Sequence, residues 1–207
     1  MADKKKSNIV TVWKESELVK ENIDFLRTPT KKVNFPTSPQ VKKIIEDLET
    51  SFRSIPCAGI AANQLRYDRK IFVGMRHDNN ISTENSSDNI DQVVPDPENF
   101  EIYINPQIDK YDGKSTQVGA EGCLSIPGLS LEIERYNEIK VRYYNVEGRV
   151  IKRPLKGFIS RLFQHELDHL NGNLMFENPL SKIGIKEAES QNHADMLIDV
   201  VKYVQSK

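Results

Sequence analysis

The sequence predicts one α+β domain, with short strands in the middle of the chain and helices before and after them. Two observations support this: apolar residues recur at helical spacing near both ends, and short segments rich in β-branched and aromatic residues lie between them. The chain has 207 residues, which is enough for one domain with a sizeable core and short for two. We therefore expect residues 1–207 to form a single domain.

The first helix is predicted to begin at Ser38. Pro29 and Pro36 interrupt any long regular element before it, whereas Ser38 can cap a helix and Pro39 suits its first turn. Apolar residues then follow at spacings of three and four: Val41, Ile44, Ile45, Leu48 and Phe52. We expect this helix to pack on the core and to carry no chemistry.

Two strands are predicted at residues 70–75 and 101–105, where the sequence reads KIFVGM and EIYIN. Between them, residues 77–99 contain six acidic residues and no Lys or Arg. So long a stretch without periodicity is unusual inside a compact domain. We expect residues 77–99 to form a surface insertion, to which the sequence assigns no role.

The second half of the chain begins with a predicted β-hairpin. Residues 138–144 and 149–152 flank a Glu-Gly turn, which is typical of two antiparallel strands. A helical pattern follows over residues 158–170, and Asn171-Gly172 would end it. A last helix is predicted over residues 188–204.

Composition excludes several classes of protein. Lys and Arg (29) nearly balance Asp and Glu (30), so we expect no sequence-specific nucleic-acid binding. Cys57 and Cys123 are too few for a disulfide framework and are expected as thiols. No apolar run approaches the roughly 20 residues of a membrane span, and residues 1–6 lack the apolar stretch of a signal peptide. We predict a cytoplasmic protein without membrane association, with an organelle as the alternative.

The strongest chemical signal is the HExxH pattern of residues 165–169, which lies within the predicted helix 158–170. His165 and His169 are four residues apart, so a helix turns both imidazoles toward one metal ion. Glu166 lies beside the first ligand and can handle a proton there. Chance occurrence of the pattern in an acidic helix is the alternative reading.

A catalytic site of this kind needs a third protein ligand and one open position. No His follows Gly172 closely enough to serve, and His193 is too distant in sequence. Two kinds of candidate remain. One is Cys123 in the segment EGCLS, and the other is a downstream glutamate: Glu177, Glu187 or Glu189.

The segment Cys57–Gln64, which reads CAGIAANQ, is rich in small residues. Small residues allow close approach of a backbone or a ligand, although a tight helix-to-strand connection would explain them equally. Gln64 ends the segment with an amide that can donate a hydrogen bond.

Taken together, GIAANQ, EGCLS and HELDH resemble the three signature motifs of the peptide deformylase family, in order and in spacing. The resemblance extends from about Leu26 to Phe176. It implies short antiparallel sheets packed around the HExxH helix, with flanking N- and C-terminal helices. It also implies one divalent ion held by Cys123, His165 and His169. Fe²⁺ is the favoured ion, and zinc, nickel and cobalt are alternatives.

The resemblance further implies the activity: removal of the N-formyl group from the formylmethionine of newly made polypeptides, with release of formate. Glu166 would act as general base and then general acid, while the Gln64 side chain and the Leu124 backbone N–H would stabilise the oxyanion. Partners would be N-formylmethionyl nascent chains, with the ribosome as a candidate place of encounter, and a monomer is favoured. Four residues would bind substrate: Gly59, Ile60, Phe158 and Leu162.

The sequence departs from the family pattern at two places, and two alternatives to the deformylase hypothesis remain. Cys57 stands where the family motif usually has glycine, and residues 77–99 are an insertion. Arg161, one residue off the pocket face, is expected to point to solvent or to a carboxylate. The alternatives are an HExxH peptidase with a glutamate as third ligand and a catalytically silent homologue that binds nascent chains. Replacement of Cys123 would separate the deformylase from the peptidase.

Overall fold

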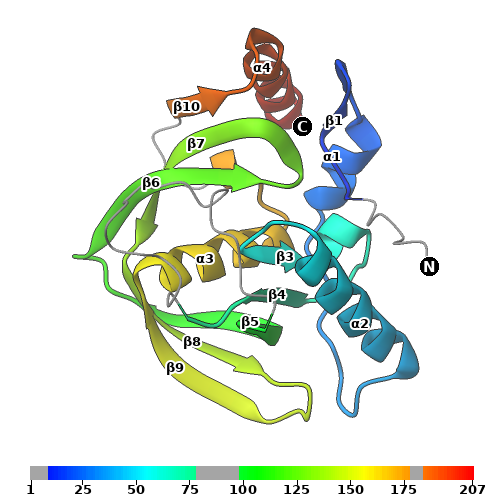
Figure 1. The fold of residues 1–207 in the computed structure, drawn as a ribbon, viewed down its shortest axis with the longest axis vertical. Coiled ribbons are helices and arrows are strands. Elements are labelled where there is room, and N and C mark those ends of the chain that lie inside the picture. Colours follow the sequence, from blue (N-terminus) through cyan, green and yellow to red (C-terminus); the bar gives the residue numbers. More distant parts are fainter. Residues whose placement is uncertain (1–8, 78–97, 178–183) are drawn as a thin grey trace.

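A computed structural model describes residues 9–77, 98–177 and 184–207 of the chain (Figure 1). The described part is α+β, as predicted. The helices are α1 (Lys20–Leu26), α2 (Pro39–Ser54), α3 (Gly157–Asn171) and α4 (Gln191–Gln205), with short 3-10 turns η1 (Ala62–Leu65) and η3 (Met175–Glu177). The strands are β1 (Trp13–Lys14), β2 (Glu17–Leu18), β3 (Gly59–Ala61), β4 (Ile71–Met75), β5 (Phe100–Tyr111), β6 (Thr116–Cys123), β7 (Ile126–Tyr136), β8 (Glu138–Tyr144), β9 (Val150–Lys156) and β10 (Gly184–Ala188).

The strands form antiparallel sheets on two sides of α3. A five-stranded sheet has the order β3-β4-β5-β8-β9, and a three-stranded sheet has the order β10-β7-β6. Strands β1 and β2 form a separate pair. Figure 1 shows α3 between the two larger sheets, with α2 beside β3 and β4 and with α4 beyond β7. The HExxH helix is therefore enclosed by sheets, as the family resemblance implied.

Helix α2 forms where the sequence predicted it. The Ser38 side chain accepts a hydrogen bond from the Val41 backbone N–H at 3.3 Å, and Pro39 occupies the first turn. All five apolar residues of the predicted stripe are buried. They pack toward β3 and β4, so this helix supports the strands that lead into the site.

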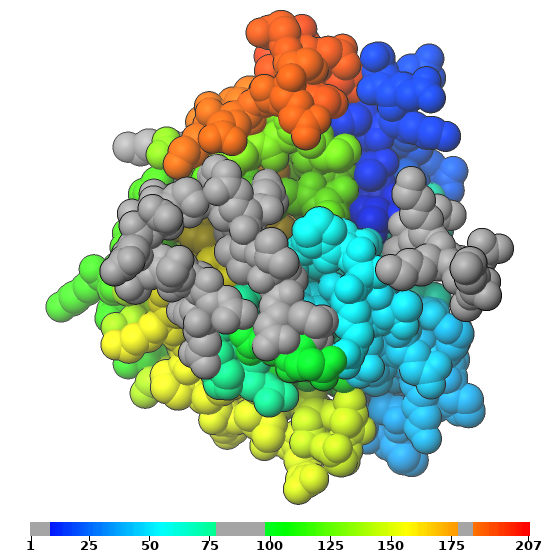
Figure 2. Space-filling view, viewed as in Figure 1, coloured from blue at the N-terminus to red at the C-terminus, as the bar shows by residue number. Residues whose placement is uncertain are grey.

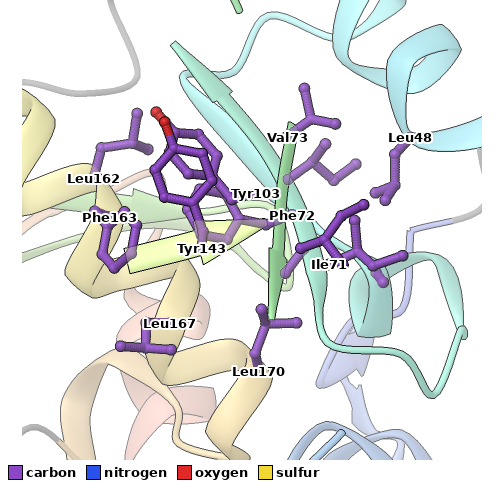
Figure 3. Close-up of a cluster of buried hydrophobic side chains, with 14 of the residues drawn as sticks. Leu48, Ile71, Phe72, Val73, Tyr103, Tyr143, Leu162, Phe163, Leu167 and Leu170 are labelled. Atoms are coloured by element: carbon purple, nitrogen blue, oxygen red, sulfur yellow. The ribbon is translucent and has the colours of Figure 1, made fainter. Parts of the chain in front are cut away.

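Two hydrophobic cores lie on opposite sides of α3. The larger one fills the space between α2, α3 and the five-stranded sheet, and Figure 3 shows its aromatic centre. There Phe72 stacks on Tyr103 at 4.3 Å between ring centroids, and Phe163 of α3 meets both rings edge-on. The smaller core joins β1, α1, β7, η3 and α4. Figure 2 shows the orange C-terminal segment against the green β6–β7 pair.

Helix α3 is buried on two faces of different character. Its apolar face turns Leu162, Phe163, Leu167 and Leu170 into the larger core. The other face is polar and contacts the β6–β7 pair through the side chains of Ser160, Arg161, Gln164, His165 and Asp168. Gly172, at φ +79°, ends the helix, as predicted.

Several boundaries differ from the prediction. Strands β6 and β7 were not predicted, and neither were α1 and β10. The predicted helix at 188–204 begins later, at Gln191, because Ala188 ends β10 and Ser190 caps the helix by accepting from the His193 N–H. The predicted insertion lies almost entirely on residues 78–97, outside the described residues. In the described part of the chain, no helix combines the length and the apolar character needed to cross a membrane.

Candidate metal centre

The structure brings Cys123, His165 and His169 together. Their ligand atoms all lie within 4.8 Å of one another, and all three residues are buried. The Cys123 Sγ lies 3.2 Å from the His169 Nε2. Cys123 ends β6, while the two histidines are one turn apart on α3, so a strand and a helix each contribute to one cluster. The alternative ligand Glu177 instead pairs with Arg27 at 2.9 Å.

The buried carboxylate of Glu121 fixes the orientation of His165. Its Oε2 lies 2.9 Å from the His165 Nδ1, and Glu121 is two residues before Cys123 on β6. An Nδ1–H donated to this carboxylate leaves Nε2 with its lone pair directed to the cluster. Carboxylates in this position are common partners of metal-binding histidines, because they select the tautomer and hold the ring.

Glu121 is itself held by two arginines. Arg135 of β7 donates two hydrogen bonds to it, at 2.9 and 2.8 Å, and Arg161 of α3 donates a third at 2.8 Å. Arg135 also pairs with Asp168, which lies beside His169. Burial alone raises the pKa of Glu121, but Arg135 and the His165 contact more than offset it, so this pKa lies well below its usual range. The carboxylate therefore stays ionised in a site that excludes water.

Glu166 faces the same cluster without such partners. Its Oε2 is buried and has no hydrogen-bond partner among the described residues. Burial raises the pKa of Glu166 to about 7, and the neighbouring His165 opposes this only in part. A carboxyl group with that pKa can both accept and release a proton near neutrality.

Gly59 makes room for Glu166. A Cβ built on Gly59 would lie 2.5 Å from the Glu166 Oε1 and 2.8 Å from the Leu162 Cδ1, both far closer than contact distance. The small residue in the first motif thus permits the β3 backbone to approach the face of α3 that carries Glu166.

We expect a Gly59→Ala variant to lose about 10²-fold in kcat/KM, because the added methyl displaces the Glu166 carboxylate by a distance that costs roughly this much in a positioned site. Gly74→Ala is the matched control. Gly74 pairs with Gly59 across β3 and β4, but its Cβ would come no closer than 3.4 Å to any atom. Turnover by the two variants, measured at equal metal content, gives the difference. Equal rates would show that Glu166 tolerates the shift.

Gln64 is fixed at the opposite side of the cluster. Its Oε1 accepts from the Ala61 N–H at 2.9 Å, which orients its Nε2 toward the Ser125 Oγ at 3.3 Å and the Cys123 Sγ at 3.8 Å. Leu124 begins the two-residue turn that joins β6 to β7, directly after the cysteine. The amide donor and this turn therefore both adjoin Cys123.

Asn63 is a contact that the sequence analysis missed. Its Nδ2 donates to the His169 backbone carbonyl at 2.6 Å, so the first motif also ties down the end of the HExxH segment. Its position in the small-residue run, directly before Gln64, was the available signal.

A small cavity of about 30 Å³ opens at the cluster. Of the four predicted substrate residues, Gly59 and Leu162 line it, together with Cys57, Gln64 and Glu166. Ile60 is fully buried in the larger core, and Phe158 is half-buried against that core, so neither is a lining residue. Burial, together with the charge of Glu166, raises the pKa of the Cys57 thiol to about 12.

A second cavity of about 580 Å³ adjoins the first. The two share Pro56, Cys123 and Leu124 in their linings. From there the larger cavity extends along β7 to residues 187–189, next to the start of α4. The two cavities therefore meet beside Cys123.

The donor set fits a single divalent ion. One thiol and two imidazoles in a buried cluster form a three-ligand set typical of a catalytic site with one open position. The same ligands suit iron and zinc, so they do not choose the metal. The buried Nδ1 of His169 has no hydrogen-bond partner among the described residues, whereas its Nε2 lies 3.2 Å from the Cys123 Sγ.

Comparison with known proteins gives a consistent result. The family model described as polypeptide deformylase matches residues 16–183. A peptide deformylase of Aquifex aeolicus is 36% identical over 72% of this chain and 78% of its own, and that of Elusimicrobium minutum is 33% identical over 80% and 88%. Among solved structures, a class I type b peptide deformylase from Acinetobacter baumannii, bound to Met-Ala-Ser, has a TM-score of 0.64 at 26% identity, covering 83% of this chain and 98% of its own. The Thermotoga maritima peptide deformylase has a TM-score of 0.60 at 33% identity, covering 74% and 89%.

Proposed function

Because the chain belongs to the peptide deformylase family, enzymes that remove the N-formyl group from newly made polypeptides, we propose that Cys123, His165 and His169 hold the single metal ion of this reaction. We assign Fe²⁺ as the ion in the cell, with zinc, nickel and cobalt as substitutes. The observation that carries the assignment of the three ligands is the convergence of their ligand atoms within 4.8 Å. When bound, such an ion lowers the pKa of water from about 15.7 toward roughly 7 and polarises a carbonyl.

Glu166 moves the protons of the reaction. Its carboxylate takes a proton from the attacking water and delivers one to the peptide nitrogen as the bond to the formyl carbon breaks. Burial and the unpartnered Oε2 support this role, because no hydrogen bond to a described residue must be broken before the proton is accepted. Glu121 is unsuited to it, since four hydrogen bonds from Arg135, Arg161 and His165 already occupy its oxygens.

Gln64 and the Leu124 N–H are the donors for the oxyanion. Gln64 is pre-oriented by Ala61, so its Nε2 requires no rearrangement as charge develops on the formyl oxygen. Leu124 adjoins Cys123 in the turn between β6 and β7. Loss of one such donor typically costs about 3–4 kcal/mol of barrier.

The substrate is the formylmethionyl end of a nascent chain. Leu162 and Gly59 line the small cavity, Ile60 belongs to the same buried apolar cluster as Leu162, and the half-buried Phe158 packs against that cluster. The adjoining larger cavity receives the residues after methionine, in keeping with the tripeptide bound by the Acinetobacter relative. We place the enzyme in the cytoplasm as a monomer that meets nascent chains at the ribosome.

The specificity of this pocket tests the proposal. Burial of about three more heavy atoms, at roughly 0.8 kcal/mol per methylene-sized group, predicts that formyl-Met peptides exceed formyl-Ala peptides about 30-fold in kcat/KM. Leu162→Ala should erode this ratio more than Phe158→Ala, because Leu162 lines the cavity and Phe158 does not.

Cys57 replaces the usual glycine of the family motif, and its side chain lines the cavity, so Cys57→Gly is the control. If Cys57 narrows the pocket, this variant should raise the ratio of kcat/KM for formyl-Met over formyl-Ala peptides. Equal kcat/KM for the two peptides in the wild type and in Cys57→Gly would show that the methionine pocket lies elsewhere.

A further inference from the structure

Arg161 departs from the rest of the site because it is a buried arginine on the HExxH helix that touches no reacting group. Its side chain is 5% exposed and lies one turn before His165. Burial of a guanidinium costs several kcal/mol unless its donors are satisfied, so its position requires a compensating set of acceptors.

Those acceptors lie on the β6–β7 pair. The Arg161 Nη1 donates to the Glu121 Oε1 at 2.8 Å and to the Ile133 carbonyl at 3.0 Å, and it lies 3.3 Å from the Gly119 carbonyl. Its Nη2 donates to the Gln117 carbonyl at 3.1 Å. One helical side chain thus contacts four acceptors on two strands. Three of them lie on β6, within the six residues that precede Cys123, and the fourth lies on β7, which pairs with β6.

The strand sequence is adapted to this contact. A Cβ built on Gly119 would lie 3.0 Å from the Arg161 Nη2 and 3.2 Å from its Cζ. Glycine at this position therefore leaves room for the guanidinium beside the β6 backbone, and a larger residue would force the guanidinium to shift by a few tenths of an ångström.

We infer that Arg161 is a positioning residue of the metal centre, which fastens the strand that carries Cys123 to the helix that carries His165 and His169. This inference rests on the metal site proposed above. Arg135 also reaches α3, through Asp168, but Arg161 is itself a residue of α3 and joins that helix to the strand pair through both the Glu121 carboxylate and the strand carbonyls. Without Arg161, the strand that carries Cys123 loses a direct link to the helix that carries His165 and His169, so the separation of the three ligands is less firmly fixed.

The test uses the full chain loaded with Co²⁺ under anaerobic conditions. Three quantities are measured for each variant: Co²⁺ affinity by competition with a chelator, the thiolate-to-cobalt charge-transfer band, and the Tm of the metal-free protein. Arg161→Met, which keeps much of the apolar stem, should bind Co²⁺ about 10–100-fold more weakly, the usual effect of losing a partner that orients metal ligands, and should alter the band. The Co²⁺ affinity of Arg161→Lys should fall between those of the wild type and Arg161→Met. An ammonium can reach Glu121 but lacks the planar guanidinium that donates to several carbonyls at once.

Arg153→Met is the matched control. Arg153 is partly buried and, like Arg161, pairs with a carboxylate, Glu101 at 2.8 Å, but it lies on β9 within the other sheet. The Arg153→Met variant should lower the Tm of the metal-free protein and leave the Co²⁺ affinity and the charge-transfer band unchanged. Gly119→Ala, which keeps the arginine and crowds its Nη2, should weaken Co²⁺ binding in the same direction as Arg161→Met and by less.

The outcomes separate the inference from the proposed site. Wild-type affinity and an unchanged band in Arg161→Met, whatever its Tm, would show that Arg161 serves stability alone. If Arg161→Met does not fold, unchanged affinity in both Arg161→Lys and Gly119→Ala would overturn the inference equally. A wild-type protein that binds Co²⁺ without a thiolate band would instead refute the Cys123 ligand, and with it the role of Arg161.

Discussion

A Glu166→Gln variant is expected to retain its metal ion and to lose at least 10²- to 10⁴-fold in kcat for deformylation. The amide is nearly isosteric with the carboxylate, so the cluster of Cys123, His165 and His169 should keep its geometry. The loss follows from chemistry, because an amide cannot take the proton of water or return one to the leaving nitrogen, and general acid–base assistance is worth about this much per step. Formate release and bound metal, measured on the same preparation, check both halves of the expectation.

Glu177→Gln is a suitable control for this substitution. Glu177 is a carboxylate of η3 that pairs with Arg27, and its loss should affect stability and leave turnover near normal. Near-normal turnover of a fully metal-loaded Glu166→Gln protein would require a different base.

A Cys123→Ala variant is expected to lose the metal ion. A four-ligand zinc site in a peptide is worth about 10–16 kcal/mol, so one ligand accounts for about 3–4 kcal/mol, or roughly a 10²- to 10³-fold weaker affinity. Dialysis against a chelator should then remove the ion from the variant at concentrations that leave the wild type loaded. Metal analysis after graded chelator treatment measures this directly.

Cys57→Ala is the matched control, because Cys57 lines the same small cavity but is not part of the ligand group. It should hold the metal as the wild type does. Full metal retention by Cys123→Ala, with loss in Glu177→Gln, would favour the glutamate-ligand peptidase over the deformylase.

The parts of the fold that could be predicted from sequence are those with local signals. Helix α2 follows from a cap, a proline and a stripe of apolar residues, and β8 from a compact run of strand-forming residues before a turn. Strand β6 lacks such a signal, because Gly119 and Gly122 weaken its intrinsic preference. Strand β7 has one that the prediction missed: Leu129, Leu131 and Ile133 alternate with polar residues, and all three are buried.

The residues of the candidate site also divide into those with a local sequence signal and those without one. Two ligands follow from the spacing of His165 and His169 on a helix, which is a local property. Cys123 is more than 40 residues earlier, so the residues alone left it as one candidate beside three glutamates, and the family resemblance selected it. Pairing of Arg161 with a carboxylate was one of its two expected outcomes, and the structure shows it with Glu121. The burial of the network and the part of Arg135 were not predicted, because charged residues are normally exposed and only the tertiary structure shows that these three satisfy one another in the interior.

The central claim is that this chain releases formate from a formylmethionyl peptide by means of one metal ion at Cys123, His165 and His169. The most direct measurement is formate release from a formyl-Met tripeptide by anaerobically purified protein, titrated with chelator and then with Fe²⁺. We predict that activity falls as the ion is removed, returns as Fe²⁺ is restored, and reaches its maximum at one ion per chain. Formate release that persists after complete removal of the ion, or that is absent from the fully loaded wild type, would contradict the account.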